Sequence, residues 1–180
     1  LTGDLFNLFV FIEVMLLPSY ALIAVTGSWT RLGVGRTFTL VNLVTSTVLL
    51  VGVALVYGAA GTVNIAALAD RGTDDLAVSL ALTLVLVALG VKAAVMPVHT
   101  WLPRTYPSTS AGVMALFSAV HTKVGLYAIL RIYTITFDEG ARWAPVLEVM
   151  IVASIVLGAL GSWGEPRIRS VLSWQMISGV

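Results

Sequence analysis

The chain has 180 residues and a formal net charge of +1, and it combines 58% hydrophobic residues with only 11% charged residues and a mean hydropathy of +0.99. An ordinary soluble domain does not combine these values, which predict an integral membrane protein. The small net charge argues against a nucleic-acid-binding surface, and the absence of cysteine excludes disulfides, thiolate metal sites and thiol nucleophiles.

Hydrophobic runs of about 20 residues, each long enough to cross the hydrocarbon core as a helix, recur along the chain. Polar stretches containing glycine or proline separate them. We therefore predict an all-α polytopic helix bundle with transmembrane segments at residues 5–26, 37–57, 76–102, 111–136, 145–163 and 168–180, the last one truncated. The chain starts without methionine or a basic leader and ends inside an apolar stretch, so we interpret it as one membrane domain that is an internal fragment of a longer protein.

The third run carries Lys92 in its middle and then meets Pro97 and Pro103. A cation inside a membrane-spanning run is costly, so it usually has a partner or a function. Proline removes a backbone donor and clashes with the preceding turn, which predicts a broken helix around Pro97. Broken helices at membrane depth persist only where protein or a water-filled cavity covers them. The lysine inside the apolar run and the predicted helix break together indicate an ion path.

Two further ionisable residues, Glu13 and Lys123, lie deep in other apolar runs. One interpretation is a static pair between Glu13 and a lysine that only holds helices together. The other is a proton relay, because intramembrane ionisable residues commonly form ion or proton pathways. A carboxylate that approaches or leaves a buried lysine changes the affinity of that lysine for a proton.

Three other residues are candidates for a proton path: His121, and the two weaker candidates His99 and Glu148. His121 lies two positions from Lys123 and therefore on a different helix face, and a histidine bonded to a serine or carbonyl inside the bundle is an equal alternative for it. His99 follows the predicted break and is equally interpreted as an interfacial residue, while Glu148 stands at a helix entrance that headgroup water reaches.

Loop charges predict an orientation, because short cytoplasmic loops of membrane proteins are enriched in lysine and arginine. With alternating helices, one face collects five arginines and the other collects Arg71 and Arg142, with Arg131 nearby. We expect the first face to be the cytoplasmic side of the plasma membrane; its arginines are Arg31, Arg36, Arg104, Arg167 and Arg169.

Four motifs in this order resemble a known family. They are GDLFNLFVFIE at residues 3–13, VKAAVMPVHTWLP at 91–103, STSAG at 108–112 and HTKVG at 121–125. The chain resembles, over essentially its whole length, the proton-conducting antiporter-like subunits shared by respiratory complex I and Mrp-type cation/proton antiporters. The first two motifs are most similar to the D-type subunits of the Mrp antiporters.

The resemblance implies a subunit of about fourteen helices built from two inverted five-helix repeats, each with a broken helix. This chain would hold helices five to nine and the start of ten. In the family, a glutamate on helix five pairs with a lysine on the broken helix, and a lysine or histidine on helix eight passes the proton onward. By motif, these roles correspond to Glu13, Lys92 and Lys123, with His121 as an accessory group.

The expected function is therefore a proton-translocating subunit of a sodium or other monovalent cation/proton antiporter, with further membrane subunits as partners. One alternative is a proton-pumping subunit of a respiratory NADH:quinone oxidoreductase or membrane-bound hydrogenase, which redox chemistry would drive. Another is a non-conducting structural subunit. The sequence shows no nucleophile motif, phosphate loop or metal-binding spacing, so neither a soluble-substrate enzyme nor a cofactor is expected.

Overall fold

A computed structural model of the chain describes residues 2–25, 29–69, 71–137 and 144–179. Within these ranges the regular elements are all helices, and one isolated bridge joins Asp4 to Asn64. The fold is an all-α helix bundle, as predicted. The elements are α1 (Leu5–Ala24), α2 (Trp29–Ala60), η1 (Ala66–Leu68), α3 (Arg71–Asp74), α4 (Leu76–Ala93), α5 (Trp101–Thr105), η2 (Tyr106–Ser108), α6 (Ala111–Thr136), α7 (Ala144–Trp163) and α8 (Ile168–Ser178).

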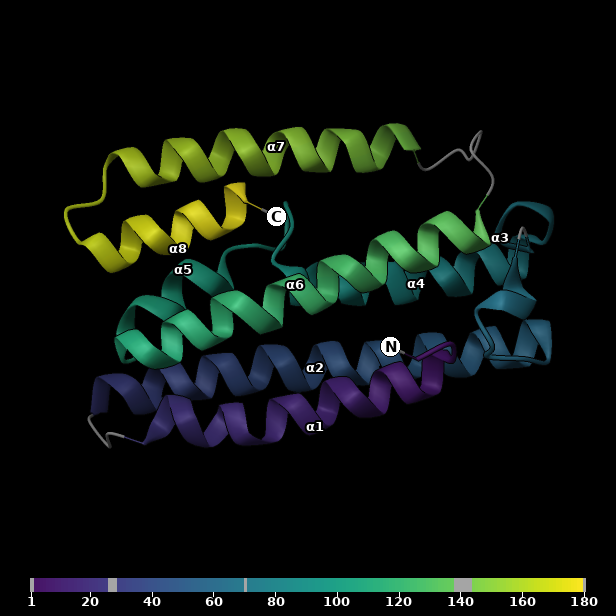
Figure 1. Cartoon of the computed structure of the whole chain (residues 1–180), viewed down its shortest axis with the longest axis horizontal. Helices are drawn as coiled ribbons and strands as arrows, with labels where there is room; N and C mark the ends of the chain where they lie inside the picture. Colours follow the sequence, from purple (N-terminus) through teal and green to yellow (C-terminus); the bar gives the residue numbers. More distant parts are fainter. Residues whose placement is uncertain (1, 26–28, 70, 138–143, 180) are drawn as a thin grey trace.

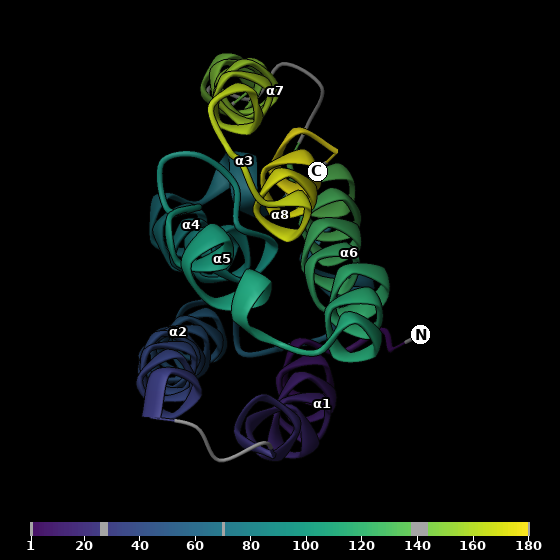
Figure 2. The same ribbon diagram turned by 90° about the vertical axis from the view of Figure 1, so that its left-hand side faces the viewer.

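The long helices lie side by side and run back and forth along one axis (Figure 1). α2 packs against both α1 and α4, α4 packs against α6, and α7 packs against α8. The view along the bundle shows α7 at the edge, beyond α8 (Figure 2). Five helices in the described part of the chain, α1, α2, α4, α6 and α7, are long and apolar enough to cross a membrane. The protein is therefore a multi-pass membrane protein.

Helix starts follow from capping side chains. Asp4 accepts a hydrogen bond from the backbone N–H of Asn7 at the start of α1, Asp75 accepts from Ala77 and Val78 at the start of α4, and Ser110 accepts from Val113 at the start of α6. Each cap satisfies an N–H group that has no partner inside its own helix.

Helix boundaries differ from the sequence-based segments in two places. The segment predicted at 37–57 lies inside the longer α2, because the helix also includes residues 29–36 before the apolar run and residues 58–60 after it. The segment predicted at 76–102 is divided into α4 and α5, and the break begins at Ala94, ahead of Pro97. Positions 26, 142 and 180 of the predictions lie outside the described residues.

Small residues allow the helices to approach one another closely. A Cβ added to Gly125 on α6 would lie 3.1 Å from the backbone nitrogen of Ala93 on α4. A Cβ on Gly158 of α7 would lie 2.6 Å from the backbone nitrogen of Ser178 at the end of α8. Glycine at these positions therefore sets the spacing of two helix pairs.

The last turn of α1, the first turn of α2, α5, the start of α6, the end of α7 and the start of α8 all lie at one end of the bundle (Figure 1, left). The elements at this end carry the five arginines that the loop charges predicted on one face. The helices thus alternate in direction, as the prediction of a single arginine-rich face assumed.

Candidate functional site

Lys92 is held one residue before the end of α4. Ala94, with φ of 58°, adopts the left-handed conformation that ends the helix. The freed carbonyl groups have hydrogen-bond partners: Gly90 O accepts from Val95 N over 3.0 Å, and Val91 O accepts from the indole Nε1 of Trp101 over 2.9 Å. The break is therefore a hydrogen-bonded structure, as buried backbone at membrane depth requires.

A neighbouring helix also supports the segment after the break. The backbone N–H of Met96 donates to Ser154 Oγ on α7 over 2.9 Å, and the same hydroxyl donates to Met150 O over 2.7 Å. Ser154 thus replaces the partner that Met96 would have had in a continuous helix. This contact fixes the broken segment relative to α7.

The Lys92 side chain reaches a carboxylate through a serine of another helix. Lys92 is only 7% exposed, and its Nζ donates to Ser46 Oγ on α2 over 3.1 Å. Ser46 Oγ in turn donates to Glu13 Oε1 on α1. Three helices, α1, α2 and α4, therefore contribute one link each to a chain that runs from ammonium to hydroxyl to carboxylate.

This arrangement compensates the buried charge of Lys92. A buried ammonium requires a compensating charge and hydrogen-bond acceptors, which Glu13 and Ser46 supply. A hydroxyl can donate and accept at the same time, so Ser46 connects the two charged groups without direct contact between them. Such a hydrogen-bonded chain is the type of path along which a proton can move between a base and an acid.

His121 lies in the same buried region, on α6. Its Nε2 is 2.8 Å from Ser19 Oγ on α1, and Ser19 Oγ is also 2.8 Å from Met15 O. The serine has one proton, so His121 Nε2 donates whenever Ser19 donates to Met15, and it can accept when the hydroxyl turns toward the ring. This is the serine partner that the structural interpretation of His121 required.

Aromatic rings enclose the imidazole of His121. The ring centroids of Phe117 and Phe38 lie 4.6 and 6.2 Å from it, and both phenylalanines are fully buried. Lys92 acts electrostatically on His121.

Lys123 does not join this buried group. Its side chain is exposed, and its Nζ donates to Gly179 O, at the end of α8, over 2.6 Å. Two positions along α6 separate Lys123 from His121, so the two side chains leave the helix on different faces, as their spacing predicted.

The two weaker candidates have different environments. His99 lies between α4 and α5, 7% exposed, with its ring 5.8 Å from that of Trp174, and its Nδ1 has no hydrogen-bond partner among the described residues. It is therefore a buried residue of the broken segment. Glu148 is exposed on α7, consistent with its position at a helix entrance.

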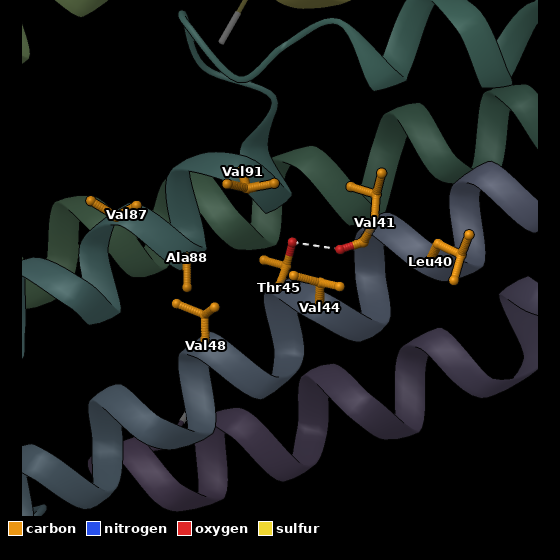
Figure 3. A pocket seen from close by; sticks show the side chains of 8 residues that line it. All are labelled: Leu40, Val41, Val44, Thr45, Val48, Val87, Ala88 and Val91. Atoms are coloured by element: carbon orange, nitrogen blue, oxygen red, sulfur yellow. Dashed lines mark hydrogen bonds between the residues drawn. The ribbon is translucent and has the colours of Figure 1, made fainter.

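An apolar groove of about 410 Å³ lies between α2 and α4 (Figure 3). Its one polar side chain, Thr45, donates to Val41 O of its own helix over 2.6 Å. Thr45 and Val91 line the groove, whereas their sequence neighbours Ser46 and Lys92 are bonded to each other. A lining of this kind offers no free polar group for proton transfer. Among the described residues, there is also no group of three or more His, Asp or Glu side chains that could hold a metal.

Sequence reasoning did not assign a role to Ser46 or Ser19. Ser46 lies in the uncharged run 37–57 together with an asparagine and four threonines, and the sequence indicates only that such residues bond within or between helices. Thr45 shows the first outcome and Ser46 shows the second. Whether such a residue bonds within its own helix or to another helix depends on which face of α2 packs against α1 and α4.

Comparison with known proteins identifies the family of the chain. Residues 2–180 match the family described as NADH:quinone oxidoreductase/Mrp antiporter, transmembrane. The chain is 38% identical to the D subunit of the Na(+)/H(+) antiporter of Alkalihalophilus pseudofirmus and 34% identical to that of Bacillus subtilis, in each case over 100% of this chain and 37% of the relative. It therefore spans little more than a third of these relatives.

Solved structures agree with this result. A chain in the structure of the Mrp complex from Dietzia sp. DQ12-45-1b is 51% identical, with a TM-score of 0.95 over 99% of this chain and 34% of that one. A chain of respiratory complex I from Thermus thermophilus is 28% identical, with a TM-score of 0.79 over 99% of this chain and 39% of that one. The protein belongs to the family of membrane subunits shared by NADH:quinone oxidoreductases and Mrp antiporters.

Proposed function

We propose that this chain is the part of a monovalent cation/proton antiporter subunit that moves protons, with Lys92 as the central proton-carrying group. The observation that carries the proposal is the series of hydrogen bonds that connects Lys92 through Ser46 to Glu13, with each residue on a different helix. Sodium is the expected cation, because relatives at 34–38% identity are named as Na(+)/H(+) antiporter subunits.

The proposed role of Glu13 is to set the proton affinity of Lys92. A nearby carboxylate favours the charged ammonium, so lengthening or breaking the link through Ser46 would promote proton release. A small movement of α1 relative to α2 would do this, because Ser46 and Glu13 lie on these two helices. Proton movement would then be coupled to helix movement.

His121 is the proposed next group. It is buried, it interacts electrostatically with Lys92, and its Nε2 contacts a hydroxyl that can donate or accept. A proton arriving at His121 repels the charge on Lys92, so the two groups would be charged in alternation. Lys123 would receive the proton on the far face of α6, toward α8.

The assembly and orientation proposals come from the family and the loop charges. The similar chains come from multisubunit membrane complexes, which supports other membrane subunits as partners. The arginine-rich end of the bundle would face the cytoplasm, since positive residues favour that side. The plasma membrane is the expected location.

A respiratory subunit is the second candidate. A chain of the membrane-bound sulfane sulfur reductase, an archaeal respiratory membrane complex, is 30% identical with a TM-score of 0.86 over 98% of this chain and 37% of that one. The same buried groups would serve a redox-driven pump. Higher identity and TM-score toward the Mrp complex favour the antiporter.

The test is cation-induced proton efflux in everted vesicles that contain the full-length protein with its partner subunits, in a host without its own antiporters. The informative variants are Lys92→Ala and Lys92→Arg. Arginine keeps the positive charge beside Ser46 and Glu13, but it is not deprotonated in proteins. A proton carrier therefore fails in both variants, whereas a static ion pair retains activity in Lys92→Arg.

Arg36→Gln is the matched control, because Arg36 is an exposed cation outside the site. Sodium-dependent efflux in the wild type, lost in both Lys92 variants at equal assembly and retained in Arg36→Gln, is the expected result. Wild-type exchange in Lys92→Arg would contradict a proton-carrying role. Proton pumping only after addition of an electron donor would identify the respiratory candidate.

A further inference from the structure

A polar pocket of about 700 Å³ opens at the arginine-rich end of the bundle, away from the buried charges. One wall comes from α5 and η2, and the other from the loop between α7 and α8 and the first turn of α8. Figure 2 looks toward this end and shows α5 next to α8. The side chains that matter for its chemistry are Arg104, Ser108, Glu165, Arg167, Arg169 and Ser170.

The charge of the pocket is strongly biased toward cations. Three arginines line it and face a single carboxylate, that of Glu165. All three arginines are exposed. Arg169 is anchored, because its Nη1 donates to Thr109 O over 3.0 Å, and the guanidinium carries further N–H donors. A rigid fork of this kind suits the oxygen atoms of a phosphate group.

The backbone adds donors to the same pocket. α8 begins at Ile168, and its N-cap residue Arg167 provides no side-chain cap. The N–H groups of the first helical turn have no acceptor within the helix, and the positive end of the helix dipole favours an anion there. Ile168, Arg169 and Ser170, which form this turn, all line the pocket. The arginine cluster and the uncapped turn thus favour the same ligand charge.

One exposed apolar residue of the pocket lining and two more that are close to it in the sequence favour a lipid as the source of the anion. Ile168 is 78% exposed and lines the pocket, and Leu172, one helical turn further along α8, is 51% exposed. Trp163, the last residue of α7, is 88% exposed, and an aromatic residue at the end of a membrane-spanning helix is typical of the headgroup level. A free phosphate ion has no apolar part that could pack against these side chains.

We propose that this pocket binds the phosphate group of an anionic phospholipid. The headgroup lies among Arg104, Arg167 and Arg169, with an acyl chain along Ile168 and Leu172 toward the bilayer core. Basic pockets between membrane helices are suited to such headgroups. The site is separate from the proton path and does not depend on the proposed transport function.

The experiment measures lipid retention by the full-length protein in its complex, with native mass spectrometry after incubation with mixed micelles of phosphatidylglycerol or phosphatidylcholine. The test variant is Arg104→Gln/Arg167→Gln, which removes two cations but leaves Arg169 and its bond to Thr109. Arg36→Gln is the control, since Arg36 is exposed on α2 and does not line the pocket. We expect preferential retention of phosphatidylglycerol and a loss of roughly tenfold or more in affinity in the double variant.

Several outcomes would overturn the proposal. Equal retention of the two lipids, or equal retention of phosphatidylglycerol by wild type and double variant, would show that the arginines do not select the headgroup. Displacement of the lipid by millimolar inorganic phosphate would identify a free anion as the ligand. Absence of any retained phospholipid in a correctly assembled complex would mean that another part of the protein occupies the pocket.

Discussion

Lys92 and Glu13 are connected through one hydroxyl group. Lys92 Nζ donates to Ser46 Oγ over 3.1 Å, and Ser46 Oγ donates to the Glu13 carboxylate. A serine between the two charges makes the strength of their coupling depend on a residue of a third helix. Measurements of stability and of transport therefore both test the connection between Lys92 and Glu13.

Replacing Ser46 tests the bridge itself. Ser46→Ala leaves Lys92 without its hydroxyl partner, which should cost about 1–3 kcal/mol of stability and reduce exchange by roughly tenfold. Ser46→Thr keeps the hydroxyl and should restore most of both. Thermal unfolding of the purified protein and proton efflux in vesicles provide the two measurements. Similar behaviour of the alanine and threonine variants would rule out the bridge.

The coupling of Glu13 and Lys92 can be measured by a double-mutant cycle with Glu13→Gln and Lys92→Met. Glu13→Gln leaves the buried Lys92 ammonium without its counter-charge and should destabilise the protein by about 3–5 kcal/mol. Lys92→Met leaves the half-buried Glu13 carboxylate without its partner and should destabilise the protein less. The double variant removes both charges, so its loss of stability should be smaller than the sum of the two single losses by about 0.5–3 kcal/mol. Additive losses, measured by thermal unfolding in detergent, would show that the pair is not coupled.

The close contact of α4 and α6 depends on Gly125. Gly125→Ala places a Cβ about 3.1 Å from Ala93 N and should destabilise the protein by about 1–3 kcal/mol through overpacking. Gly90→Ala is the matched control, because a Cβ at Gly90 on α4 meets nothing within 4 Å. The control should be neutral or stabilising by up to about 1 kcal/mol, since alanine favours helix. Equal melting temperatures for the two variants would contradict this account.

The broken segment depends on Ser154. Ser154→Ala removes the acceptor of the Met96 N–H, and leaving a donor of this kind without a partner should cost about 1–3 kcal/mol. Thr134→Ala removes an exposed hydroxyl that bonds only carbonyls of its own helix, so it should change stability little. Hydrogen exchange at residues 94–100 should increase in Ser154→Ala and stay unchanged in Thr134→Ala. An unchanged exchange rate in both would show that α7 does not hold the break.

Much of the architecture was predictable because it depends on local sequence. Apolar runs of membrane-spanning length predicted the helices, and Lys92 followed by Pro97 predicted a break in the third run. The predicted position of the break was less accurate, because α4 already ends at Ala93, four residues before Pro97. Trp101 and Ser154, which are not part of α4, satisfy the backbone groups that this early end leaves free. Contacts of that kind have no local sequence signal.

The sequence by itself determined which ionisable residues lie in the middle of apolar runs, Glu13, Lys92, His121 and Lys123 among them, since composition and hydropathy require no knowledge of packing. The tertiary structure alone decided which of them meet. Helix rotation buries His121 and exposes Lys123, two positions away, and helix packing selects Ser46 to join Lys92 to Glu13. The physical reason is that a side chain's partner depends on the rotation and spacing of whole helices, which many weak contacts and small residues such as Gly125 set together.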